Sequence, residues 1–189
     1  DFVYGNDGFL DKESLPYLST GTSSTASTSD ADLYTEYAYD ALGRITSATT
    51  TVGTTRTTYD EWAETKTDPL ANVKTFTYDA YKRLHEVEEN NSTSTYTTTY
   101  EWDMNNNLTK ITDALGNVRN FAYDGQIRRL SAEDLHASAD TSYGTWQYDY
   151  DLVGNLVWNM DPKGQEVSYS YDALNRVLTE NYTGQAGTE

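Results

Sequence analysis

The sequence predicts an all-β fold, an antiparallel meander of β-hairpin repeats. Three observations predict it: a strand-favouring composition, an aromatic-Asp pair that recurs, and a turn signal about every ten residues. The 189 residues include 17 Tyr and 4 Trp but only 4 Phe and 3 Pro. Because Tyr, Trp and Thr suit a pleated, half-buried surface, the composition itself favours β-strands.

The aromatic-Asp pair ends seven segments that align with one another: YAYD, TTYD, FTYD, YEWD, FAYD, YDYD and YSYD. These segments end at Asp40, Asp60, Asp79, Asp103, Asp124, Asp151 and Asp172, and Tyr39, Tyr78, Tyr123 and Tyr171 are among the aromatic residues before them. The two rings of Tyr-x-Tyr are one strand period apart and share one face of a sheet. We expect them to form aromatic ladders with the rings of neighbouring strands.

A second series of turn signals lies between these segments, at Asp68, Asp113 and Asp161, each 11 residues before the next aromatic-Asp pair. Short strands at this spacing predict an antiparallel meander. An Asp at a strand end can accept the backbone N–H two residues on, and Gly or Asn three residues on suits the left-handed position of a bulged hairpin. That third position holds Gly43, Gly116, Gly154, Gly164, Asn106 and Asn175.

Four turns hold other residues at that position, namely Ala63, Ala71, Lys82 and Ile127, and we expect different turn types there. An apolar residue that can pair across the hairpin follows most aromatic-Asp turns. These residues are Ile45, Leu84, Leu108, Leu156 and Val177, with Leu130 displaced by one position.

The chain divides into three parts by pattern. Residues 1–33 hold a divergent repeat and a Ser/Thr-rich loop at 19–32, residues 34–182 hold the repeat sheet, and residues 183–189 form a C-terminal tail. Polar stretches at 88–96 and 134–142 predict further exposed loop tips. Because the chain starts abruptly inside a repeat-like pattern, we interpret it as a piece of a longer protein.

Charge and residue content disfavour several classes of function. Thirteen Lys and Arg against 30 Asp and Glu give a net charge of −17, which repels nucleic acid and anionic membrane surfaces. No Cys is present, so disulfides and thiolate metal sites are excluded. No apolar run is long enough to insert into a membrane, and no signal-peptide pattern is visible at the start.

No catalytic or cofactor-binding constellation is apparent, so we expect no enzyme activity. His85 and His136 are isolated from any nucleophile pattern. The stretch DMNNN at 103–107 resembles the start of a calcium loop, but Leu108 stands where that loop needs Gly and Ala114 where it needs Glu. No metal site is therefore predicted.

The repeats resemble the YD repeat of the Rhs family over residues 34–182. The best copies are YAYDALGRI at 37–45, GNVRNFAYDGQIRRL at 116–130 and YSYDALNRV at 169–177. Members include bacterial Rhs and wall-associated toxins, toxin-complex cocoon subunits and teneurins. The resemblance implies that the hairpin repeats form a curved, twisted and open β-ribbon. This ribbon would be a segment of a larger β-shell in a secreted or surface protein, most often bacterial, that encloses or presents a C-terminal effector. Neighbouring repeats of the parent chain, and an enclosed toxin domain, would be its partners.

A carbohydrate-binding or cell-adhesion module is the alternative function, because exposed Tyr and Trp rings can stack on sugars. Trp62, Trp146 and Trp158 lie outside the aromatic-Asp positions and are the first candidates for such a site. We favour the structural interpretation, since most of the rings occupy repeat positions. A cut ribbon also exposes sheet edges, so we expect self-association that strengthens as salt screens the charge.

Overall fold

The computed structural model describes residues 2–14, 34–91 and 93–184, and every regular element in them is a β-strand. The prediction of an all-β chain is confirmed for these residues. The predicted loop at 19–32 and residues 185–189 lie outside the described part. Within the described part, no helix is long and apolar enough to cross a membrane. The chain forms two compact units, residues 1–97 and 98–189.

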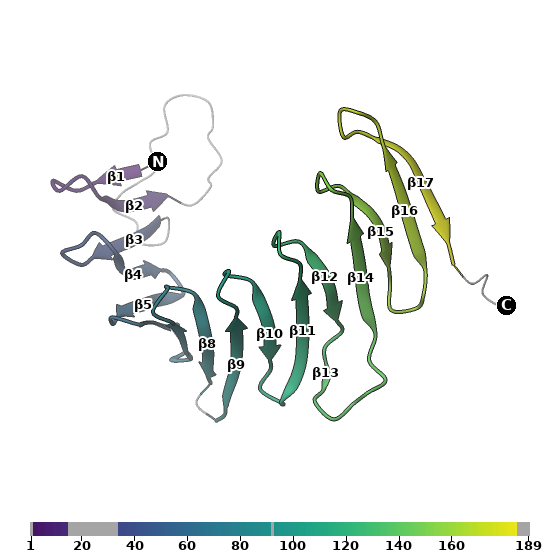
Figure 1. The fold of residues 1–189 in the computed structure, drawn as a ribbon. Helices are drawn as coiled ribbons and strands as arrows, with labels where there is room; N and C mark the ends of the chain where they lie inside the picture. The colour runs from purple at the N-terminus through teal and green to yellow at the C-terminus, as the bar shows by residue number, and fades with distance from the viewer. Residues whose placement is uncertain (1, 15–33, 92, 185–189) are drawn as a thin grey trace. The chain divides into compact units, whose positions relative to one another are not determined.

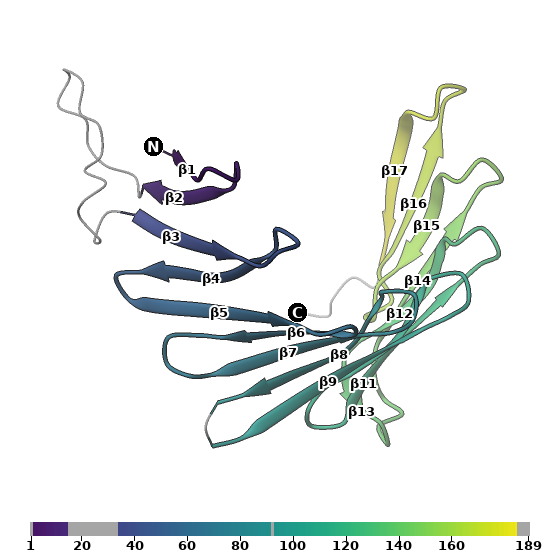
Figure 2. The same ribbon diagram turned by 90° about the vertical axis from the view of Figure 1, so that its left-hand side faces the viewer.

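Unit 1 is an antiparallel meander in which each strand pairs with the next along the chain (Figure 2). Its strands are β1 (Phe2–Tyr4), β2 (Leu10–Ser14), β3 (Tyr34–Tyr39), β4 (Ile45–Thr50), β5 (Gly53–Tyr59), β6 (Ala63–Thr67), β7 (Val73–Tyr78) and β8 (Leu84–Asn90).

Unit 2 continues the same pattern, and Figure 1 shows its strands side by side. They are β9 (Thr95–Trp102, which begins in unit 1), β10 (Leu108–Thr112), β11 (Asn117–Tyr123), β12 (Arg129–Glu133), β13 (His136–Ala137), β14 (Thr145–Tyr150), β15 (Leu156–Met160), β16 (Glu166–Tyr171) and β17 (Val177–Thr183). One departure occurs where the short β13 pairs with β11, while β12 pairs with both β11 and β14.

Both units have open sheets. Among the pairings of the described residues, none joins β1 to β8 in unit 1 or β9 to β17 in unit 2. The antiparallel meander predicted from the turn spacing and the open ribbon implied by the resemblance are both confirmed.

The residue after each turn pairs with the aromatic residue before Asp, as predicted. Tyr39 faces Ile45, and Tyr150 faces Leu156 across a register shift in the return strand. At the Asp124 turn the displaced Leu130 changes the partner, and Tyr123 faces Arg129 instead. The extra residue in each return strand is a β-bulge, which accompanies a three-residue hairpin loop.

Very little apolar surface is fully buried. Among the described residues the buried hydrophobic side chains are Val87 in unit 1 and Val118 and Ala132 in unit 2. Ala132 is only 1% exposed because it lies opposite both Phe121 and Trp146. Each unit is thus a single sheet without a second layer, and its order depends on strand pairing and on the turns.

The predicted aromatic ladders do not form in the expected way. Two aromatic-Asp strands are always separated by a return strand, so their equivalent rings are two strand spacings, roughly 9–10 Å, apart. Stacking between rings needs centroids within about 7 Å. The rings instead contact side chains of the intervening turns and strands, as described below.

The predicted loop tips are shorter than expected. Residues 88–90 belong to β8 and residues 95–96 to β9, which leaves a tip at 91–94. In the 134–142 stretch, His136 and Ala137 form β13, and the His136 ring stacks on Tyr143 with centroids 3.7 Å apart. Polar composition misled the prediction because these polar residues pair through their backbones.

Three turns expected to differ are of the common type. Ala71, Lys82 and Ile127 adopt positive φ angles of 65°, 62° and 68°, close to the 76° and 79° of Gly43 and Gly116. The surrounding hydrogen bonds impose the left-handed conformation on residues that do not favour it. Of these four positions, only Ala63 differs from the common turn type, because it is already the first residue of β6.

The strain at Ile127 is testable. A β-branched residue in the left-handed region costs about 1–2 kcal/mol, and glycine avoids this cost while losing about 0.5–1 kcal/mol of chain entropy. Ile127 is 57% exposed, so little packing is lost with it. Ile127→Gly should therefore leave stability unchanged or raise it by about 1 kcal/mol in urea unfolding.

The matched control is Gly116→Ala, where open space surrounds the added Cβ and φ is 79°. It should destabilise through backbone strain alone. A clear loss of stability in Ile127→Gly would contradict a strained Ile127.

Candidate functional site: the Asp turns and their clamps

Nine hairpin turns share one geometry and are called the Asp turns. They begin at Asp40, Asp68, Asp79, Asp103, Asp113, Asp124, Asp151, Asp161 and Asp172. In each, the Asp N–H donates to the carbonyl of the fourth residue on, and the N–H of the third residue donates to the Asp carbonyl. This is a type I turn followed by a left-handed residue.

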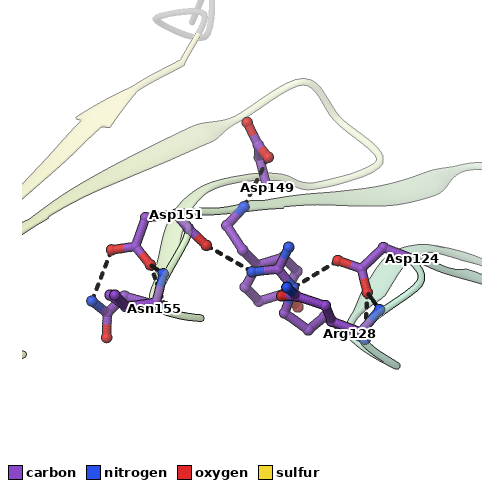
Figure 3. A network of polar contacts seen from close by, with 8 residues as sticks. Asp124, Arg128, Asp149, Asp151 and Asn155 are labelled. Atoms are coloured by element: carbon purple, nitrogen blue, oxygen red, sulfur yellow. Dashed lines mark hydrogen bonds and ion pairs between the residues drawn. The ribbon is translucent and has the colours of Figure 1, made fainter.

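One carboxylate oxygen closes each turn. Asp124 Oδ1 accepts the backbone N–H of Gln126 at 2.8 Å and that of Arg128 at 3.0 Å (Figure 3). The same two bonds, at 2.8–3.0 Å, occur in all nine turns. The predicted structural role of Asp, with its carboxylate on backbone N–H groups at strand ends, is therefore seen at every Asp turn.

The second carboxylate oxygen receives the side chain of the fourth residue, called the clamp residue. In eight turns this residue is Arg or Asn, and its Nε or Nδ2 lies 2.6–2.9 Å from Asp Oδ2. These residues are Arg44, Asn72, Arg83, Asn107, Asn117, Arg128, Asn155 and Arg176, and Gln165 holds the position in the ninth turn. Each clamp thus fixes both ends of its own loop.

These donors also determine the charge state of the carboxylates. The backbone N–H and guanidinium of Arg44 hold the pKa of Asp40 below its usual value, and Arg128 acts likewise on the pKa of Asp124. At Asp113 the amide of Asn117 is the main cause of the lowered pKa. These three carboxylates therefore stay charged at neutral pH, which keeps their hydrogen bonds strong.

Clamp residues also reach the next aromatic-Asp hairpin. The guanidinium carbon of Arg44 lies 4.2 Å from the centroid of the Tyr59 ring, and that of Arg128 lies 4.9 Å from the Tyr150 ring. Arg128 Nη1 additionally donates to the Asp151 carbonyl at 2.7 Å (Figure 3). One side chain therefore closes its own turn and fastens the following one.

The Tyr before Asp makes the reverse connection. Tyr39, Tyr59 and Tyr171 donate their hydroxyls to the carbonyls of Leu10, Ile45 and Leu156 at 2.7–2.9 Å. Each of these carbonyls belongs to the first residue of the preceding return strand. Tyrosine is preferred to phenylalanine here for a physical reason, since only its hydroxyl can satisfy that carbonyl.

The divergent N-terminal repeat keeps this plan with other residues. Gly5 takes the place of Asp, yet its N–H still donates to the Phe9 carbonyl and Gly8 N–H to the Gly5 carbonyl. Phe9 occupies the clamp position, and its ring stacks on Tyr39 with centroids 4.9 Å apart. An aromatic clamp thus replaces the Arg-Tyr contact. Asp60 is the true departure, because its N–H bonds to Ala63 and its turn is shorter.

The candidates for other chemistry are not brought together. Trp62 lies in unit 1, where Lys82 Nζ covers its ring at 4.7 Å. Trp146 and Trp158 lie on opposite faces of the sheet in unit 2, since Trp146 faces Ala132 and Trp158 faces Asp149. Trp158 Nε1 donates to Glu166 at 3.2 Å.

The residues considered for calcium and for histidine chemistry have structural partners. Asp103 accepts the N–H groups of Asn105 and Asn107 as an ordinary Asp turn. His136 Nε2 lies 3.1 Å from Glu133 Oε2. No group of three or more metal-ligating side chains is present among the described residues.

The clamp residue is the feature that the sequence analysis missed. An Arg was visible four residues after Asp in the three best copies, but its role was not deduced. Aligning all nine Asp positions would have revealed it, because the fourth residue is Arg or Asn in eight of them. Both types carry the N–H donors that Asp Oδ2 requires.

The clamp predicts that Asp→Asn costs more at an Arg-clamped turn than at an Asn-clamped one. In Asp124→Asn the new amide group would face the guanidinium of Arg128, which has donors only. In Asp113→Asn the Asn117 amide can rotate and present its oxygen. Asp124→Asn should therefore lower the thermal midpoint by several degrees more.

The two variants are matched, because each removes one negative charge and retains an oxygen for the backbone bonds. Calorimetry on both at the same pH and salt makes the comparison. Equal losses, or a larger loss in Asp113→Asn, would contradict the role assigned to the clamp.

Comparison with known proteins agrees with this geometry. Residues 61–186 match the model of the teneurin YD-shell family. The toxin protein Tse5 of Pseudomonas aeruginosa is 39% identical over 80 residues, which cover 41% of this chain and 6% of that protein.

Solved structures of toxin complexes share the fold. The crystal structure of TcdB2-TccC3-TEV matches with a TM-score of 0.77 and 15% identity over 100% of this chain and 10% of that one. The Tc holotoxin pore of Photorhabdus luminescens matches with a TM-score of 0.65 and 16% identity over 82% of this chain and 9% of that one. The chain thus spans a tenth or less of these proteins. With its repeated Asp turns and a family match over two thirds of its length, this chain belongs to the teneurin YD-shell family as a structural repeat module of the shell.

Proposed function

We propose that this chain forms part of the wall of a larger shell that encloses or presents an effector domain of its parent protein. The observation that carries the proposal is the single-layer sheet of each unit, in which clamps and tyrosine hydroxyls connect successive hairpins. Over the residues that the structure describes, such a sheet has few buried apolar side chains and no second layer. It is suited to extension by further repeats rather than to housing a reaction.

The relatives support the role of the parent. Tse5 is named a toxin protein, and the structural matches are toxin complexes. We infer a parent that is secreted or displayed on a cell surface, and we assign no catalytic step to this segment. The effector, where present, belongs to parts of the parent other than the repeat strands.

Neighbouring repeats are the partners we propose for the sheet edges. In unit 2, β17 pairs with β16 alone among the described strands, and in unit 1 β1 pairs with β2 alone. Unpaired edges template pairing with another chain. The isolated chain should therefore self-associate more as salt screens its charge of −17, whereas light scattering that shows a strict monomer at high salt would contradict this.

The shell function predicts protection of the effector by intact Asp turns. In the full-length parent, combined Asp124→Ala, Asp151→Ala and Asp172→Ala should open adjacent hairpins and expose enclosed segments to a protease. Limited proteolysis with mass spectrometry would measure the cleavage rates of segments outside the repeat region.

Lys163→Ala is the control, because Lys163 contributes only its backbone N–H to the closure of the Asp161 turn, and the substitution keeps that group. It should leave the protection intact. An unprotected effector in the native parent, or equal protection in the triple variant after confirmed turn opening, would refute the enclosing role.

A further inference from the structure

Two arginines in unit 2 depart from the repeat and lie around one phenylalanine. The guanidinium carbons of Arg119 and Arg129 are 5.3 Å and 5.7 Å from the centroid of the Phe121 ring. Arg119 and Phe121 are two residues apart on β11, and Arg129 faces Tyr123 on β12. All four side chains therefore share one face of the sheet.

These arginines have no carboxylate partner among the described residues. Arg44, Arg83, Arg128 and Arg176 are each ion-paired within their turns, whereas neither Arg119 nor Arg129 forms an ion pair there. Arg119 Nε is buried and lacks a hydrogen-bond acceptor. In a chain with 30 acidic and 13 basic residues, two adjacent unpaired cations are unexpected.

Another repeat of the same chain shows how the arrangement is completed. Phe76 lies three residues before Asp79, as Phe121 lies three before Asp124, and Lys74 corresponds to Arg119. Phe76 faces Val87, and Lys74 faces Glu89 in the next strand with Nζ–Oε1 at 2.8 Å. A cross-strand carboxylate thus neutralises the cation beside the ring.

In unit 2 the corresponding carboxylate forms no ion pair with the arginine beside the ring. Phe121 faces Ala132, so Asp134 would stand opposite Arg119 if β12 continued. β12 ends at Glu133 instead, and β13 resumes the pairing with β11 only at His136, so Asp134 lies between the two paired segments. Asp134 N–H donates to the Gly144 carbonyl at 2.8 Å, and among the described residues its carboxylate forms no ion pair with Arg119. Glu133 cannot substitute, because it lies on the opposite face and accepts from Asn120 and His136.

Arg129 adds a second cation at a position that is otherwise apolar. The fifth residue after Asp is Ile45, Leu84, Leu108, Leu156 or Val177 in the other aromatic-Asp turns of this type. The one-residue displacement of Leu130 places Arg129 there. Arg119 is half-buried and Arg129 is exposed, so a ligand can reach the pair from the face of the sheet.

We propose that Arg119 and Arg129, whose guanidinium groups both lie near Phe121, bind a carboxylate that takes the place Glu89 occupies beside Lys74. A guanidinium fork matches a carboxylate with two parallel hydrogen bonds. The chain's charge of −17 opposes a doubly charged phosphate more strongly than a singly charged carboxylate. An acidic side chain of a polypeptide, or a free small carboxylate, has the required chemistry.

Nuclear magnetic resonance of the arginine Nε–Hε groups tests the site. Propionate and propionamide mimic the ends of Glu and Gln, and sodium sulfate at equal ionic strength reports general anion attraction. Propionate should shift the Arg119 and Arg129 signals saturably, and propionamide should not. A blocked Gly-Glu-Gly peptide that binds tighter than propionate indicates a polypeptide ligand, and equal affinity indicates a free carboxylate.

Variants locate the effect. Arg119→Met keeps the apolar stem and should weaken propionate binding roughly tenfold or more. If Arg119→Met loses its dispersed amide spectrum and is therefore unfolded, Arg129→Met replaces it in the binding test, because the Arg129 side chain is exposed. Arg56→Met, at an arginine in unit 1 without an ion pair among the described residues, should change nothing. Absence of saturation, an equal response to sulfate, or an equal loss in Arg56→Met would overturn the proposal.

Discussion

The carboxylate of the first residue of each Asp turn makes the interaction on which the rest of the structure depends. One oxygen takes two backbone N–H groups and closes the turn, and the other takes the clamp residue, as at Asp124 and Arg128. The same clamp covers the Tyr150 ring and bonds to the Asp151 carbonyl. The same side chain therefore closes one turn and joins it to the next. These contacts order the strands although only three hydrophobic side chains are buried among the described residues.

This arrangement explains why strain is tolerated at particular turns. Ile127 and Lys82 would not choose a left-handed conformation in isolation. Each sits between an Asp and a clamp whose hydrogen bonds, such as Asp124 N–H to the Arg128 carbonyl at 2.9 Å, fix the loop whatever residue fills the third position. The carboxylate and the clamp, more than glycine, define the turn.

The fold could be predicted from the sequence to a large extent, because the signals that specify it are local. The Asp spacing predicted hairpin after hairpin, and the apolar residue after each turn correctly predicted the pairing of Tyr39 with Ile45 and Tyr150 with Leu156. The ring contacts could not be predicted locally, since they depend on which strand lies between two aromatic strands. Likewise, Arg119 is an ordinary strand residue in the sequence, and only the register against β12 shows that Asp134 would be its cross-strand partner and that no ion pair joins the two among the described residues.

The central claim is that clamps couple neighbouring hairpins, and a double-mutant cycle between Arg128 and Tyr150 tests it most directly. Arg128→Met, Tyr150→Leu and the double variant would be compared with the unsubstituted chain by urea unfolding. Arg128 and Tyr171 serve as the control pair, because Tyr171 lies one aromatic-Asp hairpin further along the chain than Tyr150. A half-buried cation-ring contact predicts a coupling of about 1 kcal/mol for the first pair, and additivity within about 0.5 kcal/mol for the control. Additivity in both pairs would show that each hairpin stands alone and would contradict the account.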